Sequence, residues 1–108
     1  MLKFMVVLYK RPEMSSDEFR RYLRDVHGPL AKNLPGLRRY VQNFVQADPK
    51  RKAPDWHAVI ELYFDDWAGM EAAWASPEGA ASDADLPAFA DLGRTSWSVV
   101  EEVVTGLQ

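Results

Sequence analysis

Blocks of apolar residues alternate with polar segments along the chain, and the spacing inside each block indicates its secondary structure. Apolar runs of strand length favour β-strands, whereas apolar positions three or four residues apart favour helices. The pattern predicts, in order, a strand, a helix, two strands, a helix and a strand, at residues 2–9, 16–32, 37–45, 56–64, 67–75 and 95–104. Further short helices are expected at residues 77–84 and 86–92.

The first predicted helix carries the clearest local signals. Ser15 and Glu18 have the spacing of a capping box, in which the serine hydroxyl accepts from a backbone N–H and the glutamate reaches back to the cap. The apolar positions that follow form one helical stripe: Phe19, Tyr22, Leu23, Val26 and Leu30. His27 borders this stripe. The Gly28-Pro29 pair is expected to kink or loosen the helix, because proline lacks an N–H and clashes with the preceding turn.

The order of elements predicts the fold. Two right-handed β-α-β crossovers of this length give an α+β, ferredoxin-like domain, in which both helices cover one face of a four-stranded antiparallel sheet. We expect residues 1–108 to form a single domain. The strands at 2–9 and 56–64 are apolar on both faces, so the second sheet face should also be covered. A second copy of the chain is expected to cover it, which would make a homodimer of the dimeric α+β barrel type.

Composition and charge argue against several kinds of site and partner. The chain has 108 residues, a formal net charge of −3 and no cysteine, so it can form neither a disulfide nor a thiolate site. It has no basic run with interleaved aromatics, so nucleic acid is not an expected partner. The apolar start is too short for a membrane span and lacks a cleavage region. These features fit a cytoplasmic protein, and its two histidines are too isolated to suggest a metal site.

Three titratable residues are candidates for chemistry. His27 lies where the helix is expected to break, so it is either a general acid–base group tuned by partial burial or a histidine that simply ends the helix. His57, at the start of the third strand, is either a rim residue or a polar group facing the same pocket as Glu61. Glu61 lies mid-strand between apolar residues and is either a general base or the partner of Lys3, Arg38 or Arg39 across strands.

Aromatic residues supply further candidates. Tyr9 and Tyr40 lie on strands, where a buried hydroxyl can bind a substrate carbonyl or a backbone group of the core. Trp74 and Phe89 are most simply core residues, and they could also line an apolar pocket for a ring-shaped ligand. The predicted ligand is therefore a small hydrophobic molecule.

The opening MVVLYKRPEMSSDEFRRYLRDVHGPLAKNLPGLRRYVQN is similar to the EthD family of the dimeric α+β barrel group. The later segment FDDWAGMEAAWASPEG resembles the same family. Its relatives include a methylmuconolactone methylisomerase and small decarboxylases or dehydratases of aromatic polyketide pathways. The wider superfamily contains haem-binding enzymes and cofactor-free monooxygenases. The resemblance to the methylisomerase implies roles for His27 and Tyr40, although it is lost after about Asp48.

These observations support one principal hypothesis about function. We expect a small enzyme without a cofactor that acts on a lactone, aromatic or polyketide-like compound by isomerisation, dehydration or decarboxylation. His27 would be the acid–base group and Tyr40 would polarise an oxygen. The alternatives are a non-catalytic dimer that binds a small molecule or haem, and an accessory protein of ether or aromatic degradation.

Overall fold

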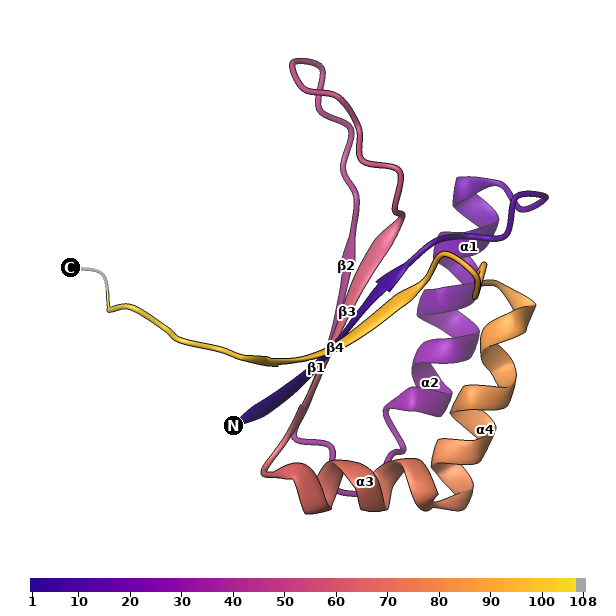
Figure 1. Ribbon diagram of the computed structural model, residues 1–108. Coiled ribbons are helices and arrows are strands. Elements are labelled where there is room, and N and C mark those ends of the chain that lie inside the picture. Colours follow the sequence, from indigo (N-terminus) through magenta and orange to yellow (C-terminus); the bar gives the residue numbers. More distant parts are fainter. Residues whose placement is uncertain (107–108) are drawn as a thin grey trace.

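A four-stranded antiparallel sheet with all helices on one side forms the body of the protein (Figure 1). The computed structural model describes residues 1–106. The strands are β1 (Leu2–Leu8), β2 (Arg39–Phe44), β3 (Ala58–Phe64) and β4 (Ser96–Glu101), in the spatial order β2-β3-β1-β4. This order confirms the predicted α+β, ferredoxin-like fold, since β1 is central and both crossovers place their helices on the same face.

The first helical region is divided into three parts. α1 (Ser16–Tyr22) begins at Ser15, whose hydroxyl accepts from the N–H of Glu18, as predicted. A π-helical turn, η1 (Leu23–His27), and the short α2 (Gly28–Ala31) follow. The predicted loosening is therefore real, but it lies in the turn before Gly28-Pro29. A wider turn there accommodates a proline, which would clash with the carbonyl of a regular helix.

The second helical region also consists of separate pieces. α3 (Trp67–Ala75) begins at Asp66, whose carboxylate accepts from the N–H of Gly69. α4 (Pro77–Asp85) begins at Ser76, and only the 3₁₀ turn η2 (Leu86–Ala88) follows it. The expected helix at 86–92 is thus too long. The strands are also shorter than predicted. The residues just beyond their ends are of types that favour β-structure, but they have no hydrogen-bonded partner on a neighbouring strand.

The hydrophobic core lies between the helices and the inner sheet face. Alternate residues of each strand point to this face, and the register places Phe4 opposite Leu62 and Val6 opposite Ile60. The largest fully buried side chains are Leu8, Leu23, Phe64 and Phe89. They come from β1, the π-helical turn, β3 and the segment after η2, so the core joins both halves of the chain.

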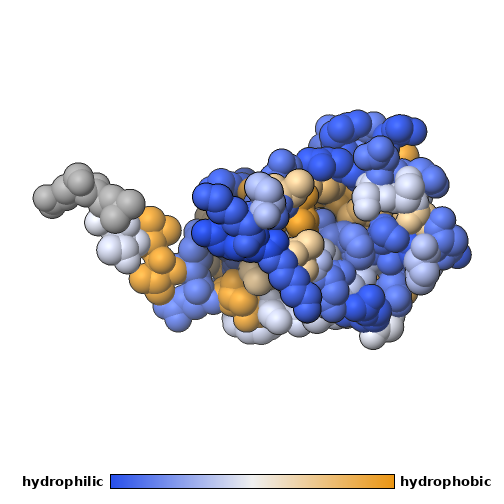
Figure 2. All heavy atoms as spheres, turned by 90° about the horizontal axis from the view of Figure 1, so that it is seen from above, coloured by the Kyte–Doolittle hydropathy of each residue, from blue (hydrophilic) through white to orange (hydrophobic). Residues whose placement is uncertain are grey.

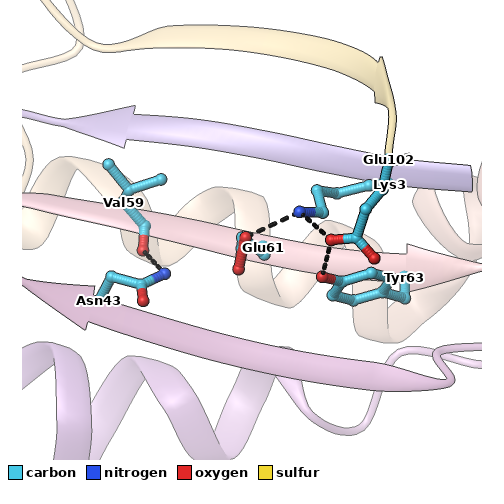
Figure 3. A network of polar contacts seen from close by, with 6 residues as sticks. All are labelled: Lys3, Asn43, Val59, Glu61, Tyr63 and Glu102. Atoms are coloured by element: carbon cyan, nitrogen blue, oxygen red, sulfur yellow. Dashed lines mark hydrogen bonds and ion pairs between the residues drawn. The ribbon is translucent and has the colours of Figure 1, made fainter. Parts of the chain in front are cut away.

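The outer sheet face is mixed rather than wholly apolar. Lys3 Nζ lies 2.8 Å from Glu61 and 2.6 Å from Glu102, and the Tyr63 hydroxyl donates to Glu102 at 2.8 Å (Figure 3). The hydrogen bonds to Glu102 and Glu61 raise the pKa of Lys3. Of the partners considered for Glu61, the structure therefore selects Lys3, whereas Arg38 pairs with Asp65 instead.

The chain after β4 extends away from the body (Figures 1 and 2). Val103 and Val104 in this arm are 79 % and 81 % exposed, although both are apolar. The arm leaves the sheet on the side away from the helices (Figure 1). It therefore adds apolar surface next to the outer sheet face.

Candidate functional site

An apolar cavity of about 430 Å³ lies between the inner sheet face and the helices. Strands β1 and β3 supply much of its floor, with Phe4, Val6, Leu8, Ile60 and Leu62. Residues of α3 and α4 form the opposite wall. The volume suits a small ring compound, and the few polar side chains in an otherwise apolar lining are the natural candidates for chemistry.

His27 is the most buried titratable group among the helical residues that line this cavity. Its Nδ1 atom lies 3.0 Å from Asp85 Oδ2, and the Tyr22 hydroxyl donates to Asp85 Oδ1 at 2.6 Å. An Asp85 carboxylate can only accept, so it fixes the His27 proton on Nδ1. Nε2 has no hydrogen-bond partner within residues 1–106 and carries the lone pair in this tautomer. His27 is therefore oriented as a base.

The protonation of this cluster follows from its burial and contacts. Burial lowers the pKa of His27, and the hydrogen bond and charge of Asp85 partly oppose that effect. The hydrogen bond to Asp85 raises the pKa of Tyr22 to about 12. At neutral pH His27 is accordingly uncharged and Tyr22 protonated. A neutral imidazole with a free lone pair can accept a proton from a molecule in the cavity.

Tyr40 of β2 also lines the cavity, on the sheet side. Gln42 Nε2 donates to the Tyr40 hydroxyl at 3.0 Å and to the Leu23 carbonyl at 2.9 Å. Since the Tyr40 oxygen accepts from Gln42, its own proton is available to a ligand. Burial raises the pKa of Tyr40, although the Gln42 hydrogen bond lowers it somewhat. Tyr40 thus stays a hydrogen-bond donor well above neutral pH.

The structure brings three of the predicted site residues to one cavity. His27, Tyr40 and Trp74 all line it. Trp74 packs edge-on against Phe4, with ring centroids 5.1 Å apart. His27 thus lies at the cavity, and its role as an acid–base group stays a prediction.

The other predicted residues lie elsewhere. Tyr9 donates to Asp55 at 3.4 Å outside the cavity, and His57 Nδ1 accepts from the Lys10 N–H at 3.1 Å. Glu61 lies on the outer sheet face, where it pairs with Lys3. His57 and Glu61 therefore do not share a pocket on the cavity side of the sheet, as one reading of the sequence had suggested. Phe89 is fully buried behind His27, with ring centroids 4.8 Å apart, and supports the imidazole rather than a ligand.

Sequence reasoning missed the hydrogen-bond partners that position His27 and Tyr40. Asp85 is 58 positions from His27, and nothing in its local sequence signals the contact. Gln42 could have been found, because it lies two residues from Tyr40 on the same strand face. Ser82, a buried polar residue of the cavity wall, was also not singled out.

Two negative findings concern the described chain. In residues 1–106, no three histidine, aspartate or glutamate side chains converge as ligands for a metal ion. Within the same residues, none of the helices combines the length and hydrophobicity needed to cross a bilayer.

Comparison with known proteins identifies relatives along nearly the whole chain. An uncharacterised 11.0 kDa protein of Rhodococcus erythropolis, encoded in the thcB-thcC intergenic region, is 29 % identical over 103 residues, which cover 93 % of this chain and 95 % of the relative. The crystal structure of an EthD family protein from Bacillus halodurans has a TM-score of 0.80 at 27 % identity, covering 95 % of this chain and all of the other.

More distant structures share the fold. A dimeric protein of unknown function and ferredoxin-like fold from Bacteroides fragilis has a TM-score of 0.67 at 14 % identity, covering 94 % of this chain and 95 % of that one. SnoaB from Streptomyces nogalater, a cofactor-independent oxygenase, has a TM-score of 0.65 at 16 % identity, covering 96 % and 94 %. The model of the EthD domain matches residues 11–93, which include both His27 and Asp85. The chain belongs to the EthD family.

Proposed function

We propose that this protein is a small-molecule enzyme of the isomerase or lyase type that moves a proton on a hydrophobic lactone, aromatic or polyketide-like compound. The observation that carries the proposal is His27, held by Asp85 with its Nε2 lone pair free, beside Tyr40 in an apolar cavity. A base and a hydrogen-bond donor around an apolar space are the parts that proton transfer from carbon requires.

The arrangement supports a simple sequence of steps. His27 Nε2 takes a proton from a substrate carbon next to a carbonyl, and the electron pair of the broken C–H bond moves onto the carbonyl oxygen. The Tyr40 hydroxyl donates to that oxygen as it becomes negative. The imidazolium, stabilised by Asp85, then returns the proton to a different carbon in an isomerisation. All groups needed belong to the chain, so we propose that no cofactor takes part.

Substitution of His27 tests the role of the base. General acid–base groups contribute about two to four powers of ten in rate, so His27→Gln should lower turnover of a confirmed substrate at least about a hundredfold. Tyr40→Phe should cost less, because the ring remains and only one hydrogen-bond donor is lost. His57→Gln is the matched control, because His57 lies outside the cavity.

Two results would separate this proposal from its alternatives. Near-normal turnover in His27→Gln, with an unchanged melting curve, would mean that the histidine is structural and the mechanism wrong. Oxygen uptake that matches substrate consumption would replace proton transfer by cofactor-independent oxygenation, the activity named for the Streptomyces nogalater protein.

We further propose that two copies associate through their outer sheet faces. Met5, Val7, Val41, Val59 and Val100 on this face are only partly buried in one copy, and the exposed arm adds apolar surface nearby. Burying such surface is the main favourable term in association. Light scattering at micromolar concentration should give twice the mass of one chain, and a monomer would contradict the proposal.

A further inference from the structure

The helical wall of the cavity consists of two stripes with the same spacing. On α3 the lining residues are Trp67, Met70, Glu71 and Trp74, and on α4 and its end they are Gly79, Ser82, Asp83 and Leu86. Each set follows the order i, i+3, i+4, i+7, which places its members on one face of a helix. Both stripes therefore face the cavity, and each carries one carboxylate among otherwise uncharged residues.

Ser82 shows that this wall has unused hydrogen-bonding capacity. The residue is 7 % exposed and lines the cavity. Its hydroxyl makes no hydrogen bond with any group in residues 1–106. Since no fully buried polar side-chain atom in that range lacks a partner, Oγ is not completely buried, and its residue lines the cavity. A serine hydroxyl in this position can donate or accept.

The charged side chains that line the cavity are carboxylates, so the lining carries negative charge. Glu71 and Asp83 have no ion-pair partner within residues 1–106, and the lining includes neither lysine nor arginine. The potential at this wall is therefore negative, which favours a cation and disfavours an anion.

Three tryptophans line the cavity, Trp67 and Trp74 from α3 and Trp97 from β4 on the sheet side. Trp74 is partly buried, while Trp67 and Trp97 are 57 % and 44 % exposed and still line the cavity. Indole faces attract cations more strongly than the other aromatic rings do. Tryptophans next to unpaired carboxylates thus give a cation two kinds of favourable contact.

We propose that the α3–α4 wall binds the protonated amine of a ring-bearing ligand, with Glu71 and Asp83 as counter-charges and Ser82 as a hydrogen-bond partner. The inference rests on the proposed function, in which this cavity holds the substrate, and it specifies the substrate as an aromatic amine-bearing compound. The ring would occupy the apolar floor, and the amine would lie at the wall opposite the sheet.

A second, shallower groove is the alternative binding position for the charged group of the ligand. Arg24 and Lys32 line it behind Tyr40, which borders both spaces. If the ligand carried a carboxylate, that groove rather than the α3–α4 wall would attract it. The sign of the ligand's charge therefore decides between the two positions.

A matched probe series tests the proposal. Phenethylamine is positively charged at pH 7, phenethyl alcohol is neutral and hydrocinnamate is negatively charged, while all three carry the same ring. Binding is followed at low salt by NMR, using the indole N–H signals of Trp67, Trp74 and Trp97, with Trp56 outside the cavity as internal reference. We expect the amine to bind about threefold to tenfold more tightly than the alcohol, and the carboxylate to bind most weakly.

Variants assign the preference to the wall. Glu71→Gln combined with Asp83→Asn should abolish the advantage of the amine while leaving the affinity for the alcohol unchanged. Asp17→Asn combined with Glu78→Gln removes the same charge from exposed positions outside the cavity and should retain the advantage. Ser82→Ala should weaken the binding of the amine a few-fold.

Each outcome has a defined meaning. If the alcohol binds in the cavity but the amine binds no better, or if the carboxylate binds more tightly, the inference about the amine is wrong and the ligand cavity stands. If none of the probes shifts the three indole signals, both the inference and the ligand cavity of the proposed function are refuted. If the advantage of the amine survives the Glu71 and Asp83 substitutions, the wall is not its binding position.

Discussion

Asp85 is the residue whose substitution tests the site most directly, because its effect can be measured without a substrate. Its carboxylate accepts from the Tyr22 hydroxyl at 2.6 Å and lies 3.0 Å from His27 Nδ1. Asp85→Asn preserves the size of the side chain but replaces one acceptor oxygen by an N–H donor. An asparagine can therefore satisfy only one of the two donors, unless His27 moves its proton to Nε2.

The expected loss of stability follows from this single lost partner. A hydrogen bond to a charged group contributes about 1.5–3 kcal/mol. The Asp85 side chain is only 16 % exposed, so removal of its charge recovers part of a desolvation cost. We therefore expect Asp85→Asn to lower the free energy of unfolding by about 1–2 kcal/mol, which corresponds to a melting temperature lower by roughly 5–15 °C.

Urea unfolding gives the free energy, and nitrogen-15 NMR of the imidazole gives the tautomer and pKa of His27. In Asp85→Asn the pKa of His27 should fall further, because burial still lowers it while the opposing effect of the carboxylate is gone. Glu101→Gln is the control, because Glu101 is exposed and lies outside the cavity, and it should alter stability by less than about 0.5 kcal/mol. If Asp85→Asn behaves like Glu101→Gln in stability, tautomer and pKa, then Asp85 does not orient the histidine.

Further predictions concern pH, packing and assembly. Burial lowers the pKa of both His27 and His57, so below about pH 6.5 the unfolded chain binds more protons than the folded chain. The free energy of unfolding should therefore fall as the pH drops from about 6.5 towards 5, and His27→Gln and His57→Gln should each flatten this slope. A Cβ at Gly79 would meet backbone carbonyl atoms of α3 at 2.7 Å or less, so Gly79→Ala should cost about 1–3 kcal/mol in urea unfolding, whereas Gly93→Ala should be nearly neutral. Val7→Glu should convert the proposed dimer to a monomer in light scattering, and a dimer that persists would argue against the outer sheet face as the interface.

The order of the elements could be predicted because each one carries its own local signals. Ser15 and Asp66 begin their helices with side-chain caps, and both caps are visible in the sequence. The alternation in β3 assigned its residues to two faces correctly. The π-helical turn was not predictable in detail, because its position depends on how the chain fits a proline into a helix that already packs on the sheet.

The sequence predicted only those residues of the candidate site whose own place in a helix or strand suggested a functional role. His27 stood out at a helix break and Tyr40 on a strand, and both reach the cavity. Alternation grouped His57 with Glu61, but His57 precedes β3 and its ring packs against Phe19 of α1, whereas Glu61 lies on the outer sheet face. Asp85 escaped notice because its partnership with His27 depends on tertiary packing across 58 positions.

One turn of the helix links His27 and Tyr40. The Leu23 carbonyl accepts from the Gly28 N–H, as the π-helical turn requires, and it also accepts from Gln42 Nε2. A Cβ on residue 28 would lie 2.9 Å from that nitrogen, so glycine leaves room for the glutamine. Gln42 in turn holds the Tyr40 hydroxyl, while the last residue of the same turn is His27. One backbone irregularity therefore helps to position both His27 and Tyr40, the two residues on which the proposed mechanism depends.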